Sequence, residues 1–570
     1  MPNTRGKILL RLVVTCLVLG VAVKVLSPHR SAETVPSGQK QPLTGGDFWS
    51  KSSGKKEELL KPEEAPPKEV DAPQEVPPKE EDAGAQAPNA EPPREPSGPL
   101  RIVHLDLKGA APKIKYLEQI FPLFSSLGAT GVLMEYEDMF PYQGDLKILQ
   151  SPHAYSLEDI KQIRNLAKLS NLEVIPLVQV FGHLEFVLKH EQFTSLREIA
   201  EFPNSLNPHA PGSQALVKDM VTQVLEQHPD SSWFHMGADE VFGLGESQDS
   251  KNWLHTNNGD KGRMYLNHVT TVARFIKEKR PAVGLLMWDD MMRQIGVDVL
   301  KESGLQNLAS PMIWFYSPEL NLKAIDNLIS KYQEVGFKGV WFASAFKGAS
   351  DIAQIWTPLG HHLNNHLSWL KVISSMSKYP SISFRGIVLT GWQRYEHFTV
   401  LCEILPVAIP SLAVCLQTLV HGEFADKAQL ETQHILGCKI AIDKGICEGS
   451  GAFSGSQVYN MVLHISRNLQ KQTDDLMKDY NVRGSFTHYH RKYNFANPRN
   501  LGFFMEKLKK LLDEWETYME NFRTQMEAIF FPDTVEEWMD ENVNRNMDRL
   551  RKMVGDAERI GKLKGGPKSH

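Results

Sequence analysis

Residues 102–136 read IVHLDLKGAAPKIKYLEQIFPLFSSLGATGVLMEY, and this stretch predicts a strand–helix–strand unit. Its two ends, IVHLDL and GVLMEY, are apolar almost throughout, as strands are when helices cover both faces of a parallel sheet. The residues between these ends carry the pattern of a helix. This alternation predicts an α/β fold in which a parallel sheet is wound with helices.

Working outward, the same alternation repeats until the chain contains eight apolar runs. The six further runs are VIPLVQV (174–180), WFHMGAD (233–239), GLLMWDD (284–290), MIWFYS (312–317), GVWFASAF (339–346) and GIVLTGW (386–392). Eight parallel strands with helices between them predict a closed (β/α)8 TIM barrel, here over residues 99–400. A doubly wound open sheet is the alternative, but DLKGAAPK, after the first run, lacks the glycine spacing of a phosphate-binding loop.

The chain before the barrel has a different composition. Residues 8–26, ILLRLVVTCLVLGVAVKVL, follow Arg5 and Lys7 and predict a signal-anchor, a transmembrane segment within residues 1–30. A cleaved signal peptide is the alternative, although no small-x-small cleavage pattern follows the apolar run. Residues 31–98 are rich in Pro, Glu, Lys and Ala and predict a disordered stalk, because such a composition cannot bury enough surface to offset the entropy of ordering.

The chain after the barrel is predicted to be helical over residues 401–560, with a basic tail at 561–570. Two long amphipathic stretches, at 499–530 and 534–554, carry stripes of Met and aromatic residues. Such stripes are expected to pack onto a domain surface. Pairing with a second copy in a homodimer is the alternative.

The composition limits the kinds of partner. The formal net charge of −5 over 570 residues gives no strong field, so nucleic acid is not expected as a partner and a small, mostly neutral ligand fits better. The five cysteines are too scattered for a disulfide framework and lack the paired spacing of a zinc site. Most are expected to be core thiols, although Cys438 and Cys447 are close enough in sequence to pair in an oxidising compartment; the others are Cys16, Cys402 and Cys415.

The active site of such a barrel lies at the carboxyl ends of its strands. Four predicted strands end in charged residues, namely Asp106 with Lys108, Glu135 with Glu137 and Asp138, Asp239 with Glu240, and Asp289 with Asp290. Aromatic residues join them at Trp288, Trp314, Tyr316, Trp341, Trp392 and Tyr395. Carboxylates accept hydrogen bonds from hydroxyls and aromatic rings pack on the C–H face of a pyranose, so this combination favours a sugar as the ligand.

The adjacent acids Asp239 and Glu240 point to a particular chemistry. Capping of the next helix explains many acids at strand ends and suffices for Asp138 and Asp290, but VFGLGES, after Glu240, begins no amphipathic helix. A retaining glycosidase usually holds its acid and its nucleophile about 5 Å apart across the scissile bond, which neighbouring residues seldom do. If Glu240 is the acid/base, Asp239 is expected to hold an N-acetyl group whose carbonyl oxygen attacks C1.

Several motifs resemble those of family 20 glycoside hydrolases, the β-N-acetylhexosaminidases. HMGADE (235–240) resembles the family motif H-x-G-x-D-E, while VFGH (180–183), MWDDM (287–291) and GWQRYEH (391–397) are similar to its elements after the third, fifth and last strands. The resemblance covers residues 100 to about 555 and is nearest to a branch without the usual N-terminal β domain. It implies a retaining exo-glycosidase that removes terminal GalNAc or GlcNAc residues from glycans through an oxazolinium intermediate, without a cofactor.

The resemblance also implies roles for individual residues. Asp239 orients the acetamide, and Glu240 acts first as general acid and then as general base. The tryptophans wall the acetamide pocket or stack on the sugar, and Tyr316 donates to the acetamide oxygen. Most of the family grips the 3- and 4-hydroxyls with an arginine on strand one, whereas HLDLKG leaves an acid or a lysine in that place. Glu396 contacts outer hydroxyls or, alternatively, caps a helix. The implied substrate-binding residues are Asp106, Lys108, His183, His235, Trp288, Asp289, Trp314, Tyr316, Trp392 and Glu396.

The predicted anchor and stalk resemble the stem of a type II Golgi enzyme. They predict a single-pass membrane protein of the secretory pathway, although the chain contains no Asn-x-Ser/Thr sequon. A cytoplasmic or nuclear protein is the alternative if the apolar segment does not insert.

Two other functions compete with the glycosidase. A metal-dependent hydrolase could use the histidines and acids near strand positions, but His104 and His235 precede their strand-end acids and are expected to lie deeper in the barrel. A non-catalytic, lectin-like protein would keep the barrel and lose an acid at position 239 or 240, and both acids are present.

Overall fold

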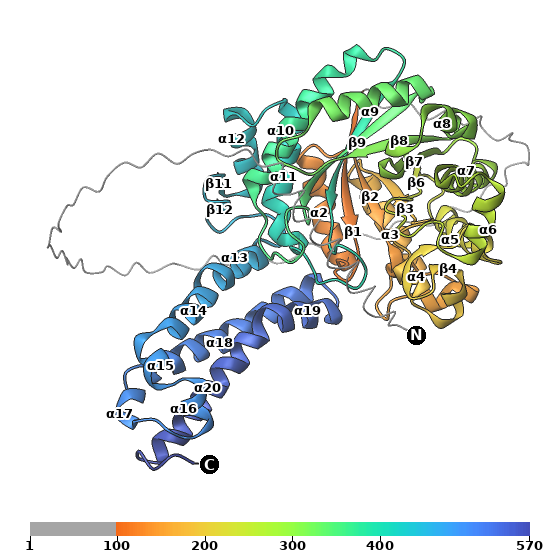
Figure 1. The fold of residues 1–570 in the computed structure, drawn as a ribbon. Helices are drawn as coiled ribbons and strands as arrows, with labels where there is room; N and C mark the ends of the chain where they lie inside the picture. The colour runs from red at the N-terminus through yellow and green to blue at the C-terminus, as the bar shows by residue number, and fades with distance from the viewer. Residues whose placement is uncertain (1–97, 570) are drawn as a thin grey trace, which may run out of the picture. The chain divides into compact units, whose positions relative to one another are not determined.

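The structure, a computed structural model, describes residues 98–569 (Figure 1). Eight parallel strands close into a barrel in the order β1-β10-β9-β8-β7-β6-β3-β2. Their bounds are β1 (Leu100–Asp106), β2 (Gly131–Glu135), β3 (Glu173–Leu177), β6 (Trp233–His235), β7 (Gly284–Trp288), β8 (Ala309–Trp314), β9 (Gly339–Lys347) and β10 (Ser383–Gly391). Because β1 pairs with β10 as well as β2, the sheet closes on itself.

The predicted closed barrel is therefore confirmed, and the open-sheet alternative is wrong. Each of the eight predicted runs overlaps one barrel strand. The largest difference is at residues 233–239, of which only Trp233–His235 form a strand. Gly237 and Ala238 have φ angles of 61° and 68°, a left-handed conformation that strands do not use, so the chain leaves the sheet early.

Eight helices follow the strands and surround the barrel (Figure 1). They are α2 (Ile114–Ser126), α3 (Leu157–Leu169), α5 (Ser213–Gln227), α7 (Lys261–Lys279), α8 (Val297–Ser303), α9 (Leu322–Val335), α10 (Leu359–Ser374) and α11 (Leu405–His421). Smaller elements between them are α4 (Glu185–Leu188), the hairpin of β4 (Arg197–Ile199) and β5 (Phe202–Leu206), and α6 (Gln248–Thr256). Since α11 is the helix that follows the last strand and is buried along most of its length, the barrel extends past residue 400, its predicted end.

Two apolar layers hold the barrel together. The inner layer fills the barrel itself with large side chains, and the outer layer lies between the strands and the helices. Trp341, which we expected at the mouth of the barrel, belongs to the inner layer, where it is fully buried against Trp233 with ring centroids 5.1 Å apart. The interior is thus a packed core below the site and not a channel.

The C-terminal region is helical, as predicted. After α12 (Asp426–Leu436) it contains the hairpin of β11 (Lys439–Ala441) and β12 (Ile446–Glu448), then α13 (Ser456–His464), α14 (Gln470–Lys478), α15 (Tyr480–Ser485), α16 (His488–Lys492), α17 (Pro498–Leu501), α18 (Met505–Ile529), α19 (Pro532–Met539) and α20 (Arg545–Lys562). The aromatic stripes face inward: Phe522 packs on Trp538 at 4.9 Å, and Trp515 Nε1 donates to Thr473 Oγ1 at 3.0 Å. These side chains are buried within the chain, as expected for stripes that pack onto a domain surface. The alternative, pairing in a homodimer, stays a prediction.

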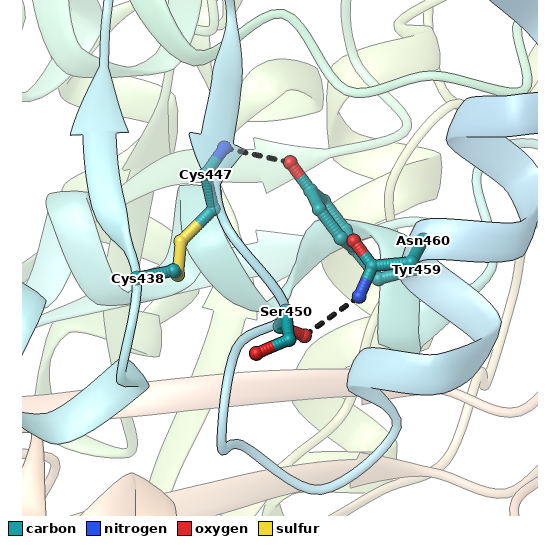
Figure 2. The surroundings of a disulfide bond; sticks show 5 residues. All are labelled: Cys438, Cys447, Ser450, Tyr459 and Asn460. Atoms are coloured by element: carbon teal, nitrogen blue, oxygen red, sulfur yellow. Dashed lines mark hydrogen bonds between the residues drawn. A yellow bond between two sulfur atoms is a disulfide. The ribbon is translucent and has the colours of Figure 1, made fainter. Parts of the chain in front are cut away.

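Cys438 and Cys447 form a disulfide across the β11–β12 hairpin (Figure 2). The backbone N–H of Cys447 donates to the Tyr459 hydroxyl at 2.8 Å, which ties the hairpin to α13. Cys402 and Cys415 are buried free thiols. For the four cysteines that the structure describes, both expectations are therefore confirmed: two are core thiols, and the two that are close in sequence form a disulfide.

The predicted anchor (1–30), almost all of the predicted stalk (31–98) and Cys16 lie outside the described residues. Within residues 98–569, no helix is long and apolar enough to cross a membrane.

Candidate active site

A cavity of about 360 Å³ lies where the barrel strands end. It is lined by eight of the predicted site residues, namely Lys108, His183, Asp239, Glu240, Trp288, Trp314, Tyr316 and Trp392. These residues follow or end six different strands, so only closure of the barrel brings them together. The volume is at the small end of the range for ligand pockets, which suits one sugar unit with its substituents.

The backbone turns sharply at the two adjacent acids. Ala238 and Glu240 have φ angles of 68° and 42°, a left-handed conformation that costs a non-glycine residue on the order of 1 kcal/mol or more. The turn is stabilised because the Glu240 N–H donates to Asp290 Oδ2 at 2.9 Å. It also passes very close to Gly182, where a Cβ would stand 2.1 Å from the Asp239 carbonyl oxygen. The glycine of the VFGH motif is thus required to place the acids.

His183 lies between the two acids and contacts both. Its Nε2 is 3.4 Å from Asp239 Oδ2 and 3.2 Å from Glu240 Oε2. Burial lowers the pKa of His183, but the charge of Asp239 and the hydrogen bond to Glu240 outweigh burial and raise it to about 10. The imidazole is therefore charged at neutral pH, and it holds the two carboxylates side by side in the cavity wall.

The two acids differ in their surroundings. The Asp239 side chain is 10% exposed, whereas that of Glu240 is 29% exposed. Burial raises the pKa of Asp239 to about 7, although the charge of His183 works in the opposite direction. Gln179 Nε2 donates to Asp239 Oδ1 at 3.1 Å and fixes its orientation. Asp239 is thus placed to hold a group deep in the cavity, while Glu240 can reach a group that leaves toward solvent.

Lys108 sits in a cluster of buried carboxylates at one side of the cavity. Its Nζ lies 3.2 Å from Asp106 Oδ1, 3.4 Å from Glu135 Oε1 and 3.5 Å from Glu137 Oε1. Burial lowers the pKa of Lys108, but these three neighbours raise it well above its ordinary value. Burial also raises the pKa of Glu137 to about 8, with Lys108 opposing that rise. The ammonium group is therefore charged and firmly oriented where a sugar hydroxyl can meet it.

Aromatic rings form the remaining wall of the cavity. Trp314 and Tyr316 stack with ring centroids 5.3 Å apart, and Trp288 lies 5.8 Å from Trp392. Lys108 Nζ stands 5.4 Å from the centre of the Trp392 ring. Flat apolar faces beside fixed polar groups are the combination that a pyranose needs.

Four residues implied by the motifs do not line the cavity. Asp106 lies behind Lys108, where it accepts the backbone N–H of Gln393 at 2.7 Å. His235 is buried against Trp288, with ring centroids 4.5 Å apart, and burial lowers its pKa to about 3. The other two, Asp289 and Glu396, also do not line the cavity. Asp289 is fully buried and pairs with Arg293 and Tyr332, while Glu396 accepts the backbone N–H of Phe398 at 3.2 Å in a turn.

The helix-capping interpretation of Asp290 is also wrong. Besides accepting the Glu240 N–H, Asp290 lies 3.4 Å from Trp314 Nε1, so it supports two residues of the cavity. The Asp138 side chain makes an ion pair with Lys189, whose Nζ lies 3.8 Å from Asp138 Oδ2. The tandem acids of MWDDM therefore have opposite orientations: the first faces the helices and the second faces the site.

Comparison with known proteins places these features in a family. Residues 120–322 match the model of the glycosyl hydrolase family 20 catalytic domain. Hexosaminidase D of Homo sapiens is 44% identical over 464 residues, which cover 81% of this chain and 95% of that protein. The chain belongs to glycosyl hydrolase family 20. The Bos taurus protein called Hexosaminidase D is 54% identical over 338 residues, covering 59% of this chain and 97% of its own length.

Solved structures include a chitobiase of Flavobacterium johnsoniae, which superposes on this family 20 chain with a TM-score of 0.45 and 11% identity, over 82% of this chain and 78% of that one.

Sequence reasoning missed some residues of this family 20 site. The missed lining residues are Gln179, Gly348, Ala349, Ser350, Asp351, Ile352 and Arg394, whereas Glu135 and Tyr395, which also line the cavity, were expected at the strand ends. Gln179 stands in VIPLVQV, an apolar run where a single amide is a signal that could have been used. The loop 348–352 gave no such signal, because nothing in its composition separates it from other loops.

Two of the three histidines of the rival metal site, His104 and His235, are engaged elsewhere in this family 20 chain. His104 Nε2 contacts Glu135 Oε2 at 3.0 Å, and His235 Nδ1 accepts the backbone N–H of Gly237 at 3.0 Å. Within residues 98–569, no three His, Cys, Asp or Glu side chains are grouped so that they could hold a metal ion.

Proposed function

We propose that this family 20 chain is a retaining exo-β-N-acetylhexosaminidase that removes terminal N-acetylhexosamine residues by substrate-assisted catalysis. The observation that carries the proposal is the unequal placement of two adjacent acids in one cavity. Asp239 is nearly enclosed and oriented by Gln179, while Glu240 is about one third exposed on the other side of His183. The names of the Homo sapiens and Bos taurus relatives support the same activity.

The reaction follows from this placement. The acetamide carbonyl oxygen of the bound sugar attacks C1 as the glycosidic C–O bond breaks, and Glu240 gives its proton to the leaving oxygen. Asp239 accepts the acetamide N–H and stabilises the positive charge of the cyclic oxazolinium ion. A water molecule then gives its proton to Glu240 and attacks C1, which opens the ring and restores the acetamide. Two displacements at C1 leave its configuration unchanged.

The remaining lining residues fit this reaction. The stacked Trp314 and Tyr316 and the neighbouring Trp288 and Trp392 provide a largely apolar enclosure that keeps water from the acetamide. Lys108, held by three carboxylates, is placed to donate to a hydroxyl of the terminal sugar. A cavity for one sugar unit agrees with removal of residues from chain ends.

The decisive experiment is hydrolysis of aryl β-N-acetylhexosaminides by the parent and by Glu240→Gln. The amide cannot give a proton to the leaving oxygen, so we expect turnover to fall by at least about a hundredfold for poor leaving groups, while ligand affinity is kept. Glu246→Gln is the matched control, because that side chain is 52% exposed and does not line the cavity. Equal turnover in parent and Glu240→Gln would remove the assignment, and loss of turnover on adding a chelator would favour the metal-dependent rival.

For the location, we propose that residues 8–26 anchor the chain as a type II protein of the secretory pathway. The support is the apolar sequence of that segment and the stalk-like composition that follows it. Extraction of membranes with alkaline carbonate tests this: the full chain should stay with the membrane and a version starting at residue 98 should not.

A further inference from the structure

Helix α19 of the C-terminal region reaches the wall of the active-site cavity through Arg394. Arg394 lines the cavity from the loop after β10, two residues beyond Trp392. Its Nη1 donates to Glu537 Oε1 at 2.6 Å, and its Nη2 donates to Glu537 Oε2. Glu537 belongs to α19, so a residue far along the chain holds both terminal nitrogens of a cavity residue. Such a two-point contact fixes orientation as well as charge.

The absence of a side chain at Gly109 leaves room for the Arg394 guanidinium. A Cβ at Gly109 would stand 2.1 Å from Arg394 Nη2, and Gly109 has a φ of 70°, so only glycine fits there without a shift. Thr534, also on α19, donates through Oγ1 to the Gly109 carbonyl at 2.8 Å. Helix α19 therefore contacts the loops after both the first and the last barrel strand, which carry Lys108 and Trp392.

Arg394 keeps hydrogen-bonding capacity beyond these contacts. Of its five N–H donors, two go to Glu537 and one goes to the Thr399 carbonyl. The other two have no acceptor in the part of the chain that the structure describes, although the side chain is only 12% exposed. Sugar hydroxyl oxygens are suitable acceptors for such donors.

We propose that Arg394 donates to a hydroxyl of the bound sugar and that Glu537 is the positioning residue that makes this possible. The C-terminal helical region is then part of the substrate-binding site. This inference rests on the proposed hexosaminidase function. Without the Glu537 carboxylate, the arginine can turn away, and binding of the ground state and of the transition state should weaken together.

The test is steady-state hydrolysis of an aryl β-N-acetylhexosaminide by the full chain and by Glu537→Gln. We expect KM to rise about fivefold or more while kcat stays within about twofold, because uniform binding is lost and the reacting groups are untouched. Glu516→Gln is the matched control: Glu516 accepts from Arg551 at 2.8 Å on the exposed surface of the same region. Its KM should equal that of the parent.

A double-mutant comparison separates positioning from general stability. In an Arg394→Ala background, Glu537→Gln should cause no further rise in KM, because its only route to the substrate is gone. The same rise in both backgrounds, or an unchanged KM for Glu537→Gln in the parent, overturns the inference. Glu537→Asp keeps the charge on a shorter side chain and should give an intermediate KM; it replaces Glu537→Gln if thermal melting shows that the amide variant does not fold. An inactive parent would overturn the proposed function itself, whereas an active parent with unchanged variant kinetics would overturn only this inference.

Discussion

Replacement of His183 by glutamine tests how the two acids are kept in their working states. The imidazole carries a positive charge between Asp239 and Glu240, and it is one of the groups that limit the rise in the pKa of Asp239 caused by burial. Glutamine keeps a hydrogen-bond donor and removes the charge. The pKa of Asp239 should therefore rise above its present value of about 7, so that a smaller fraction of the enzyme has an ionised Asp239.

The distances allow the size of this effect to be worked out. A unit charge 3.4 Å from Asp239 Oδ2 contributes about 5 kcal/mol at an effective dielectric constant of about 20. Both side chains are slightly open to solvent, and water will enter the space, so we expect a rise in the Asp239 pKa of about one to two. At pH 7 the ionised fraction would then fall from about one half to roughly 1–10%. The value of kcat/KM should fall roughly 5- to 50-fold at this pH.

The assay is kcat/KM for an aryl β-N-acetylhexosaminide between pH 5 and pH 9, measured for the parent, His183→Gln and the exposed-surface control His255→Gln. Because kcat/KM reports the free enzyme, the ratio of parent to His183→Gln should be largest at acidic pH and should fall steadily toward pH 9, as Asp239 becomes ionised in the variant as well. A ratio that does not change with pH would refute the electrostatic role of His183. An equal loss in His255→Gln would show that the effect is not local to the cavity.

Three further outcomes are expected. The Asp239→Ala variant should fold normally, but its kcat should fall by at least about a hundredfold. It should also bind a thiazoline mimic of the cyclic intermediate more weakly than the parent does, and equal affinity in parent and variant would contradict the role of Asp239 in holding the acetamide. The Lys108→Met variant has buried carboxylates without their cation, so its free energy of unfolding at neutral pH should be about 3–5 kcal/mol lower than that of the parent. A urea denaturation midpoint equal to that of the parent would contradict the buried charge cluster. Cys438→Ser should lower the free energy of unfolding of the oxidised protein by about 2–3 kcal/mol and should leave that of protein reduced beforehand unchanged. Peptide mass mapping that finds free thiols at Cys438 and Cys447 in the oxidised parent would contradict the bond between them.

The barrel could be predicted from the sequence because its pattern is local and repeated. Strands covered on both faces must be apolar along their length, and each is followed by a helix, so eight runs could be recognised without knowing how they pair. The main error, at residues 236–239, arose where the backbone leaves the strand for a left-handed turn. The apolar run continues there because those residues are buried by the site, and composition alone does not distinguish burial in a strand from burial in a turn.

The direction of each side chain was harder to predict than its presence near a strand end. Asp289 and Asp290 are adjacent and chemically identical, yet the first is bound by Arg293 among the helices and the second supports Glu240. A difference of one position decides which side of the sheet edge a side chain faces, and that register depends on the exact residue at which the strand ends. Arg394 was missed for a related reason, since its partner Glu537 stands 143 positions later in the chain.

By itself the sequence determined the class of fold, the pair of acids and the kind of ligand, because these depend on residue types and on spacing within short segments. Only the tertiary structure decided which acids face the cavity, that His183 joins Asp239 to Glu240, and that α19 holds Arg394 in the cavity wall. Those facts depend on closure of the barrel and on contacts between distant segments, and packing of the whole chain is what fixes them.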